Sequence, residues 1–229
     1  MRFFVQQQVL DLGTKIVFPV IESFDNREVP ESWLSVRNER LARQLMRYRD
    51  TDVHADPVLE GFNVLHDQGH IRRKKNVPAP ITLVKLLVKR GTMPLINPVV
   101  DIYNLISIES GLALGAHDIA HVDGDVTLRF VDGSERFVPL GTDAPVAVRP
   151  GEYAYCDDAN EILCRLEVRQ VNKTAATPST TDAFFIVQGN AATSDEYVLG
   201  VAQQLIDEVT EHLGGTGHIE IPHVIGRDD

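Results

Sequence analysis

Two pairs of histidines stand four residues apart, a spacing that puts both imidazoles on one face of a helix and suits a metal ion. They are His66 with His70 and His117 with His121. The first segment, HDQGH, lacks the glutamate of the HExxH metalloprotease motif and contains a glycine. The second, HDIAH, follows the expected end of a helix, so its spacing does not define a helix face. The sequence therefore predicts no metal site, and metal-dependent hydrolysis is the weaker alternative.

Motifs for covalent catalysis and for cofactors are absent from the sequence. It has no GxSxG segment, no P-loop and no GxGxxG fingerprint, so we expect no nucleotide or other cofactor. VDGD at 122–125 lacks the further acidic ligands of a calcium loop. Cys156 and Cys164 flank the short turn DDAN and are expected to be small buried thiols, facing a core or each other across a hairpin.

The elements that position the polar side chains follow from the spacing of apolar residues. Four helices are predicted, at residues 30–49, 80–90, 98–110 and 194–213. Residues 7–23 predict a strand, a turn and a strand, and residues 56–62 predict short extended pieces. Between 119 and 187 the pattern changes to short strands separated by turns such as VDGD and RPGE. Helices followed by several short strands predict an α+β fold with a mixed or antiparallel sheet.

The helix predicted at 98–110 carries Asp101, Asn104 and Glu109 among residues that are apolar on most sides. Buried polar groups need hydrogen-bond partners, so these three side chains indicate either the wall of a pocket or the pinning of neighbouring loops.

Composition places the chain among ordinary globular proteins, with 43% hydrophobic and 24% charged residues. No apolar run approaches the roughly 20 residues that span a bilayer, and MRFFVQQQVLDLG is not a secretory signal. Two cysteines make no disulfide framework, which favours a reducing compartment. We therefore expect a cytoplasmic protein with no membrane partner.

The charge of the chain is unevenly distributed. The net charge is −11, yet residues 68–100 contain seven basic and no acidic side chains. Such a stretch could hold a phosphate backbone locally. The alternative is a solvated loop and helix face. The candidate RNA-binding residues are Arg72, Arg73, Lys74, Lys75, Lys89 and Arg90.

Residues 97–118 read NPVVDIYNLISIESGLALGAHD. They resemble, without a gap, the pattern N-x-V-V-D-I-x-N-(x)4-E-x-G-x-P-L-H-A-(F/Y)-D of the editing (B3/B4) domain in the β subunit of bacterial phenylalanyl-tRNA synthetase. The matching positions are Asn97, Val99, Val100, Asp101, Ile102, Asn104, Glu109, Gly111, Leu114, Ala116 and Asp118. The register continues through Arg129, Glu135, Gly141 and Asp157, so the resemblance covers about residues 56–190.

The resemblance breaks at positions that the synthetase domain uses for editing. Where the family has a pocket histidine this chain has Gly115, and His117 follows two residues later. The family's glycine-rich strand and loop is replaced by ILCRLEVRQ, and Ile186 stands near the position of the glutamate that recognises the substrate's side chain. The resemblance therefore implies a similar scaffold with a re-lined pocket that is not tuned to the tyrosine phenol.

For a stand-alone protein of this kind the implied activity is hydrolysis of mischarged aminoacyl-tRNA in trans. Water would attack the ester, which requires a positioned water and donors to the oxyanion more than a strong nucleophile. The candidate catalytic residues are His117 for the water and Arg129 and Arg165 for the carbonyl or phosphate. The candidate substrate-binding residues are Asn104, Gly115, Asp118, Glu135, Asp157, Arg169, Thr174 and Thr181.

Each of these assignments has a structural alternative. His117 is otherwise a surface or capping histidine, and the threonines are otherwise part of a polar loop. The arginines are otherwise ion-paired, and their nearest candidate partners are Glu135, Asp157, Glu161 and Glu167.

The resemblance also implies a B3/B4-like three-layer arrangement formed by residues 56–190. Residues 1–55 are expected to complete it as a strand and helix extension, and residues 191–229 to add a closing helix and tail. The implied partner is tRNA or aminoacyl-tRNA, and the chain is too short to be expected to charge tRNA itself. A non-catalytic module that binds RNA or an amino acid in the same pocket is the alternative, and the oligomeric state is left open.

Overall fold

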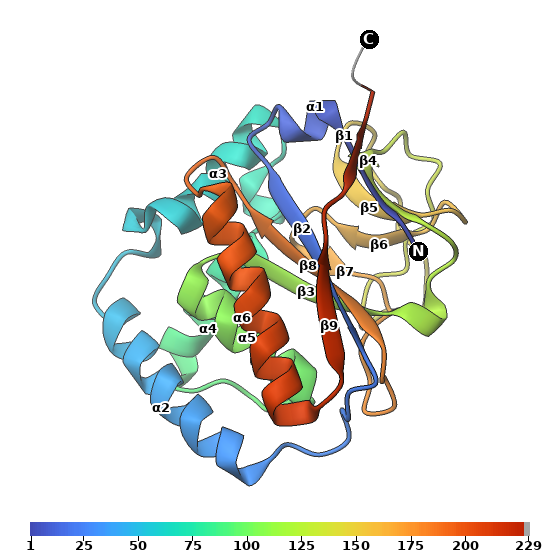
Figure 1. Ribbon diagram of the computed structural model, residues 1–229. Helices are drawn as coiled ribbons and strands as arrows, with labels where there is room; N and C mark the ends of the chain where they lie inside the picture. Colours follow the sequence, from blue (N-terminus) through green and yellow to red (C-terminus); the bar gives the residue numbers. More distant parts are fainter. Residues whose placement is uncertain (227–229) are drawn as a thin grey trace.

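Two β-sheets and a layer of helices make up the computed structural model, which describes residues 1–226 (Figure 1). The four-stranded sheet is antiparallel, in the order β3-β8-β2-β9. The six-stranded sheet, in the order β10-β1-β4-β5-β6-β7, is mixed because β1 runs parallel to both of its neighbours. The strands are β1 (Phe3–Gln6), β2 (Lys15–Glu22), β3 (Ala113–Asp118), β4 (Val126–Phe130), β5 (Tyr153–Asp157), β6 (Ile162–Arg165), β7 (Arg169–Gln170), β8 (Ala183–Gly189), β9 (Thr216–Glu220) and β10 (His223–Ile225).

Most of the α-helices cover one face of the four-stranded sheet, and the six-stranded sheet covers the other (Figure 1). Two helices also contribute Val9, Phe62 and Leu65 to the core between the sheets. The described α-helices are α1 (Gln7–Leu10), α2 (Glu31–Tyr48), α3 (Pro57–Gln68), α4 (Ala79–Arg90), α5 (Pro98–Ser110) and α6 (Asp195–Leu213). Short 3₁₀ turns are η1 (Val53–Ala55), η2 (Arg73–Lys75) and η3 (Ile119–His121). The order helix, sheet, sheet confirms the predicted α+β class and the three-layer arrangement.

Strand β2 shows why the four-stranded sheet is the middle layer. Its side chains alternate between two cores, with Val17 and Ile21 packed under the helices and Ile16 and Phe18 packed against the other sheet. A strand that is covered on both faces becomes apolar on both faces. The two cores are therefore separate. Any space between the two sheets is lined by side chains of the core that contains Ile16 and Phe18.

The helix that follows Asn97 is specified at both of its ends. Asn97 caps α5 by accepting a hydrogen bond from the backbone N–H of Val100, and Pro98 occupies the first turn. Gly111 ends the helix with a left-handed φ of 73°, which glycine adopts without strain. Helices α2, α4 and α6 also lie where the apolar spacing predicts them.

The prediction of short extended pieces at 56–62 was wrong, because this segment begins α3. Asp56 is its N-cap and accepts hydrogen bonds from the N–H groups of Val58 and Leu59, and Pro57 sits in the first turn. Aspartate followed by proline is a strong start signal for a helix.

The N-terminal prediction was half right. Strand β2 is present, but residues 7–10 form the short helix α1 and the first strand, β1, precedes it. The tail adds β9 at the edge of one sheet and β10 at the edge of the other, and residues 227–229 lie outside the described part of the chain.

Replacing Asp56 with alanine should lower the free energy of unfolding by about 2–3 kcal/mol. The carboxylate caps α3 and also holds the Tyr48 hydroxyl and the Arg47 guanidinium, at 3.0 and 2.8 Å. The loss combines a missing cap with a hydroxyl left without its partner. Asp50→Ala, at an exposed position, is the control and should change stability by less than about 0.5 kcal/mol. Equal losses in urea denaturation would contradict the assignment.

Candidate functional site

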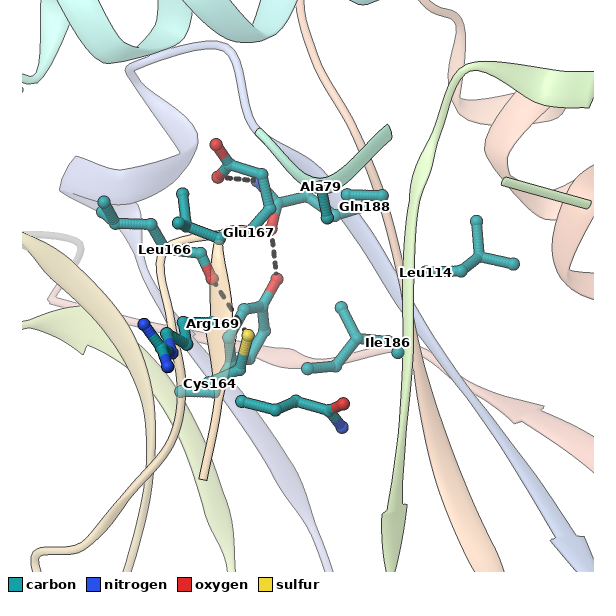
Figure 2. A pocket seen from close by; sticks show the side chains of 13 residues that line it. Ala79, Leu114, Cys164, Leu166, Glu167, Arg169, Ile186 and Gln188 are labelled. Carbon is teal, nitrogen blue, oxygen red and sulfur yellow. Dashed lines mark hydrogen bonds between the residues drawn. The ribbon is translucent and has the colours of Figure 1, made fainter. Parts of the chain in front are cut away.

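A cavity of about 90 Å³ lies between the two sheets. Strands β3 and β8 line it from the four-stranded sheet, and β5, β6, β7 and the β6–β7 loop line it from the six-stranded sheet. Ala79, at the start of α4, closes one side (Figure 2). The cavity is therefore formed by segments that are distant in sequence and meet only in the fold.

Small side chains on β3 leave this space open. Ala113 and Gly115 face the second sheet, whereas Leu114 and Ala116 belong to the core under the helices. In Figure 2 the Leu114 side chain points away from the other labelled residues. A Cβ at Gly115 would meet its nearest neighbour, Gln170 Nε2, at 3.7 Å, and the backbone there does not have a positive φ. The backbone conformation at residue 115 does not require glycine. The missing side chain instead leaves space in the cavity.

A chain of hydrogen bonds joins the sheets beside the cavity. Tyr155 Oη donates to Gln188 Oε1 at 2.6 Å, and Gln188 Nε2 donates to Glu167 Oε2 at 3.4 Å (Figure 2). The Tyr153 hydroxyl donates to the same Glu167 oxygen at 2.5 Å. All four side chains are buried, so the chain forms the inner side of the cavity.

The Glu167 side chain also contacts His66 Nε2, and both side chains are almost completely buried. A buried carboxylate is strongly destabilising unless it is paired and hydrogen-bonded. Here one oxygen meets the imidazole and the other meets Tyr153 and Gln188, so the pair ties α3 to the β6–β7 loop.

Burial also sets the protonation of the groups around the cavity. It raises the pKa of Tyr153 and of Tyr155 well above the usual value for tyrosine. Burial, and then the nearby Glu167 carboxylate, raises the pKa of the Cys164 thiol to about 12. Cys164 is therefore a thiol at neutral pH and not a thiolate nucleophile.

The open side of the cavity carries a cation and an amide. Arg169 is exposed, and within residues 1–226 its guanidinium has one hydrogen bond, to the Leu140 carbonyl at 3.2 Å, and no carboxylate partner. Gln170 Nε2 donates to the Ala116 carbonyl at 2.5 Å, which leaves its amide oxygen as an acceptor. We call this side the mouth.

Of the predicted site residues, the structure places Gly115 and Arg169 at the cavity. Arg129 and Arg165 do not line it, and both follow the ion-pair alternative. Arg129 Nη1 lies 2.6 Å from Glu135 Oε1, and Arg165 makes a two-point contact with Glu152 at 2.7 and 2.8 Å. Glu152 was not among the acids expected from sequence.

The predicted acidic residues hold turns. Glu135 accepts from the N–H of Gly133 at 2.9 Å, and Asp157 accepts from the N–H of Glu161 at 2.9 Å. Asp118 accepts from the Thr180 hydroxyl at 2.7 Å. None of these three carboxylates lines the cavity.

His117 is on the same face of β3 as Gly115 but is fully buried two residues further along. Its Nδ1 lies 2.7 Å from the Thr174 hydroxyl, and its ring stacks on Phe184 at 5.0 Å. Burial lowers the pKa of His117 to about 3. His117 and Thr174, predicted separately as site residues, are thus brought together, but in a buried position where imidazole is a poor general base.

Two other predicted residues lie elsewhere. Asn104 lines a small hollow with Arg37 and Asp101 on the helix side of the four-stranded sheet. Thr181 is exposed and donates to Asp182 at 2.6 Å.

The predicted basic surface is divided by the fold. Arg73 is paired with Asp67 and with Glu60, whereas Arg72, Lys74 and Lys75 are exposed. Lys89 and Arg90 stand at the far end of α4, roughly 15 Å along its axis from Ala79.

The exposed basic turn is tied to the cavity. The N–H of Ala79 donates to the Glu167 carbonyl at 2.9 Å, and Asn76 accepts a hydrogen bond from Arg165 at 3.1 Å. The segment that carries Lys74 and Lys75 is therefore anchored to strands that line the cavity.

The two histidine pairs do not form helical metal motifs. His66 is in α3, but His70 follows the helix with a φ of 54°, and His117 is on a strand. No group of three or more metal-ligating side chains occurs in residues 1–226. No helix in that part of the chain is long and apolar enough to cross a membrane.

Glu167, Gln188, Gln170, Tyr155 and His66 were not predicted as site residues. A single signal was available in the sequence: Glu167 is an acidic residue between Leu166 and Val168, in a stretch otherwise suited to a buried strand.

A family model for the B3/4 domain matches residues 69–201, more than half of the chain. The chain belongs to the B3/4 domain family. The match spans every cavity-lining residue from Ala79 to Gln188, but His66, the partner of Glu167, precedes it.

Similar curated proteins are phenylalanine–tRNA ligase β subunits. This B3/4 chain is 31% identical over 109 residues to the one from Colwellia psychrerythraea strain 34H, which covers 48% of the chain and 13% of that protein. It is 27% identical over 124 residues to the one from Mycoplasma genitalium, covering 54% of the chain and 15% of that protein. The aligned region is thus a small part of each relative.

A solved structure has a similar fold. An N-terminal fragment of the phenylalanyl-tRNA synthetase β subunit from Pyrococcus horikoshii superposes with a TM-score of 0.51 at 13% identity, over 100% of this chain and 52% of that one. At this identity the likeness concerns the fold alone.

Replacing His117 with asparagine should flatten the pH dependence of stability. Because burial holds the folded-state pKa at about 3, below the value of about 6.5 for an unfolded chain, the unfolded state binds the extra proton between these values. Stability should therefore fall as pH drops from about 6.5 toward 3. Between pH 7 and 4.5 the natural protein should lose about 2–3 kcal/mol more than the variant.

Urea unfolding at the two pH values measures this difference. His121→Asn, which changes an exposed histidine, should keep the natural slope. Parallel pH profiles for the natural protein and His117→Asn would show that His117 titrates normally.

Proposed function

We propose that this B3/4 domain recognises the aminoacylated end of a tRNA. The aminoacyl group occupies the cavity between the sheets, and the RNA phosphates lie along the exposed basic turn. The names of its relatives, phenylalanine–tRNA ligase β subunits, supply the class of ligand. The cavity supplies a place for the aminoacyl group.

One observation carries the proposal. The mouth of the cavity holds an arginine with no carboxylate partner in the described chain, and the segment with Lys74 and Lys75 is anchored to the cavity wall through the Ala79–Glu167 hydrogen bond. An arginine without a carboxylate partner can form strong charge-assisted hydrogen bonds to a ligand's anionic group or carbonyl oxygen. In a chain of net charge −11, these exposed basic side chains also favour the approach of a polyanion over the acidic remainder of the surface.

The reaction that this arrangement supports best is hydrolysis of the aminoacyl ester by water. Arg169 can donate to the oxygen that becomes negative as water adds to the ester carbonyl. The amide oxygen of Gln170 can accept from the substrate's ammonium group or from the water. In this proposal Arg169 takes the donor role that the sequence assigns to Arg129 and Arg165, because those two are held by carboxylates.

A non-catalytic binding module is the second candidate, and one observation favours it. The groups on the inner side are engaged or protonated, since one Glu167 oxygen accepts from Tyr153, the other contacts His66, and Cys164 is a neutral thiol. Binding requires the cavity and the cation but no general base.

Arg169→Ala should weaken binding of the matching aminoacyl-tRNA about 10-fold or more, the usual effect of losing a charge-assisted hydrogen bond. Filter binding and deacylation of a panel of mischarged tRNAs measure affinity and turnover. Arg49→Ala removes an exposed arginine next to the end of α2 and should stay within about twofold of the natural protein. Turnover supports the hydrolase, and binding without turnover supports the module. If the natural protein neither binds nor hydrolyses any member of the panel, the proposal is wrong.

The double variant Lys74→Ala, Lys75→Ala should reduce the slope of log affinity against log salt by about 1.4–1.8, because two phosphate contacts disappear. The double variant Arg43→Ala, Arg49→Ala removes the same charge from the helical layer and should leave the slope unchanged. Identical slopes for the two double variants would place the RNA elsewhere on the surface.

A further inference from the structure

The inner side of the cavity is occupied by a phenol of the protein itself. Tyr155 projects from β5, in the interior of the six-stranded sheet, and its hydroxyl reaches Gln188 on the opposite sheet at 2.6 Å. The side chain has no exposed surface, and its ring also meets the edge of Phe18 at a centroid distance of 6.1 Å. The full depth between the sheets at this point is therefore filled by one tyrosine.

The acceptors behind that tyrosine are already in use. Gln188 Oε1 receives the Tyr155 hydroxyl, one Glu167 oxygen receives Tyr153, and the other contacts His66. A ligand that carried a hydroxyl or a charge to this depth would have to displace one of these partners. An apolar ligand group would displace none.

The remaining surface of the cavity is small and apolar. Ala113 and Gly115 face it from one sheet, and Ile186 stands beside Gly115 on the neighbouring strand. The Cys164 thiol, a soft apolar group when protonated, faces it from the other sheet (Figure 2). The volume of about 90 Å³ is that of a compartment for a short side chain.

We infer that the cavity selects a compact aliphatic aminoacyl group, of the size of alanyl to valyl, and excludes aromatic ones, with Tyr155 as the residue that sets this limit. This inference rests on the proposed function and names the substrate class of the same site. Tyr155 determines specificity through the bulk of its ring, which fills the depth between the sheets. The ammonium and ester of the substrate remain at the mouth, near Gln170 and Arg169.

The test uses non-hydrolysable 3′-aminoacylamino-3′-deoxyadenosines that carry alanyl, valyl, phenylalanyl or tyrosyl groups, with binding measured by titration calorimetry on the full chain. The natural protein should bind the valyl and alanyl compounds about 10-fold or more tightly than the two aromatic ones, as expected for a pocket that discriminates by shape. Tyr155→Leu should bring the phenylalanyl compound to within about threefold of the valyl one or better. Tyr155→Phe keeps the ring and should keep the natural preference.

A second enlarging variant, Ile186→Ala, covers the case in which Tyr155→Leu does not fold, and urea unfolding establishes which variants are native. Equal or tighter binding of the aromatic compounds by the natural protein overturns the specificity and leaves the proposed function standing. An unchanged preference in a folded Tyr155→Leu also overturns it. If none of the four compounds binds, the proposed function fails and this inference fails with it.

Discussion

The buried carboxylate of Glu167 is the constraint on which the candidate site depends. A carboxylate removed from water needs partners, and this one draws them from three parts of the fold: His66 from α3, Tyr153 from the six-stranded sheet and Gln188 from the four-stranded sheet. Removing one partner would leave a buried polar group without its contact, so the elements are held in one arrangement. The sheets are thereby joined by polar bonds at a place where apolar packing is incomplete.

Incomplete packing between the two sheets is the second feature of the candidate site. Ala113 and Gly115 on β3 are too small to reach the opposite sheet, and Tyr155 fills the depth beside them without filling the space in front. Protein interiors normally close such gaps. This gap opens at one side beside Arg169, and the segments that line it are hydrogen-bonded to the basic turn. Such a space is more typical of a ligand-binding site than of a packing defect.

Local signals in the sequence predicted much of this architecture. Helices α2, α4, α5 and α6 follow from apolar spacing and from proline and glycine at their ends, because these depend on residues a few positions apart. The segment 97–118 indicated the family and directed attention to Gly115. The start of α3 was missed although Asp56 and Pro57 specify it locally.

The site itself was less accessible to prediction, because its contacts join distant residues. His66 and Glu167 are about a hundred positions apart, and no pattern in either segment predicts that the two side chains are in contact. Arg129 and Arg165 have the residue type required for catalysis, but which arginine is paired and which is free depends on carboxylates brought close by the fold. His117 was likewise a reasonable candidate until its burial was known.

A crystal structure of the chain with 3′-valylamino-3′-deoxyadenosine bound tests the central claim most directly. The account predicts electron density for the valyl group between Gly115 and Ile186, with the amide carbonyl toward Arg169 and the Glu167 contacts unchanged. Density for the ligand on another surface, with the space between the sheets closed by the protein's own side chains, would contradict it.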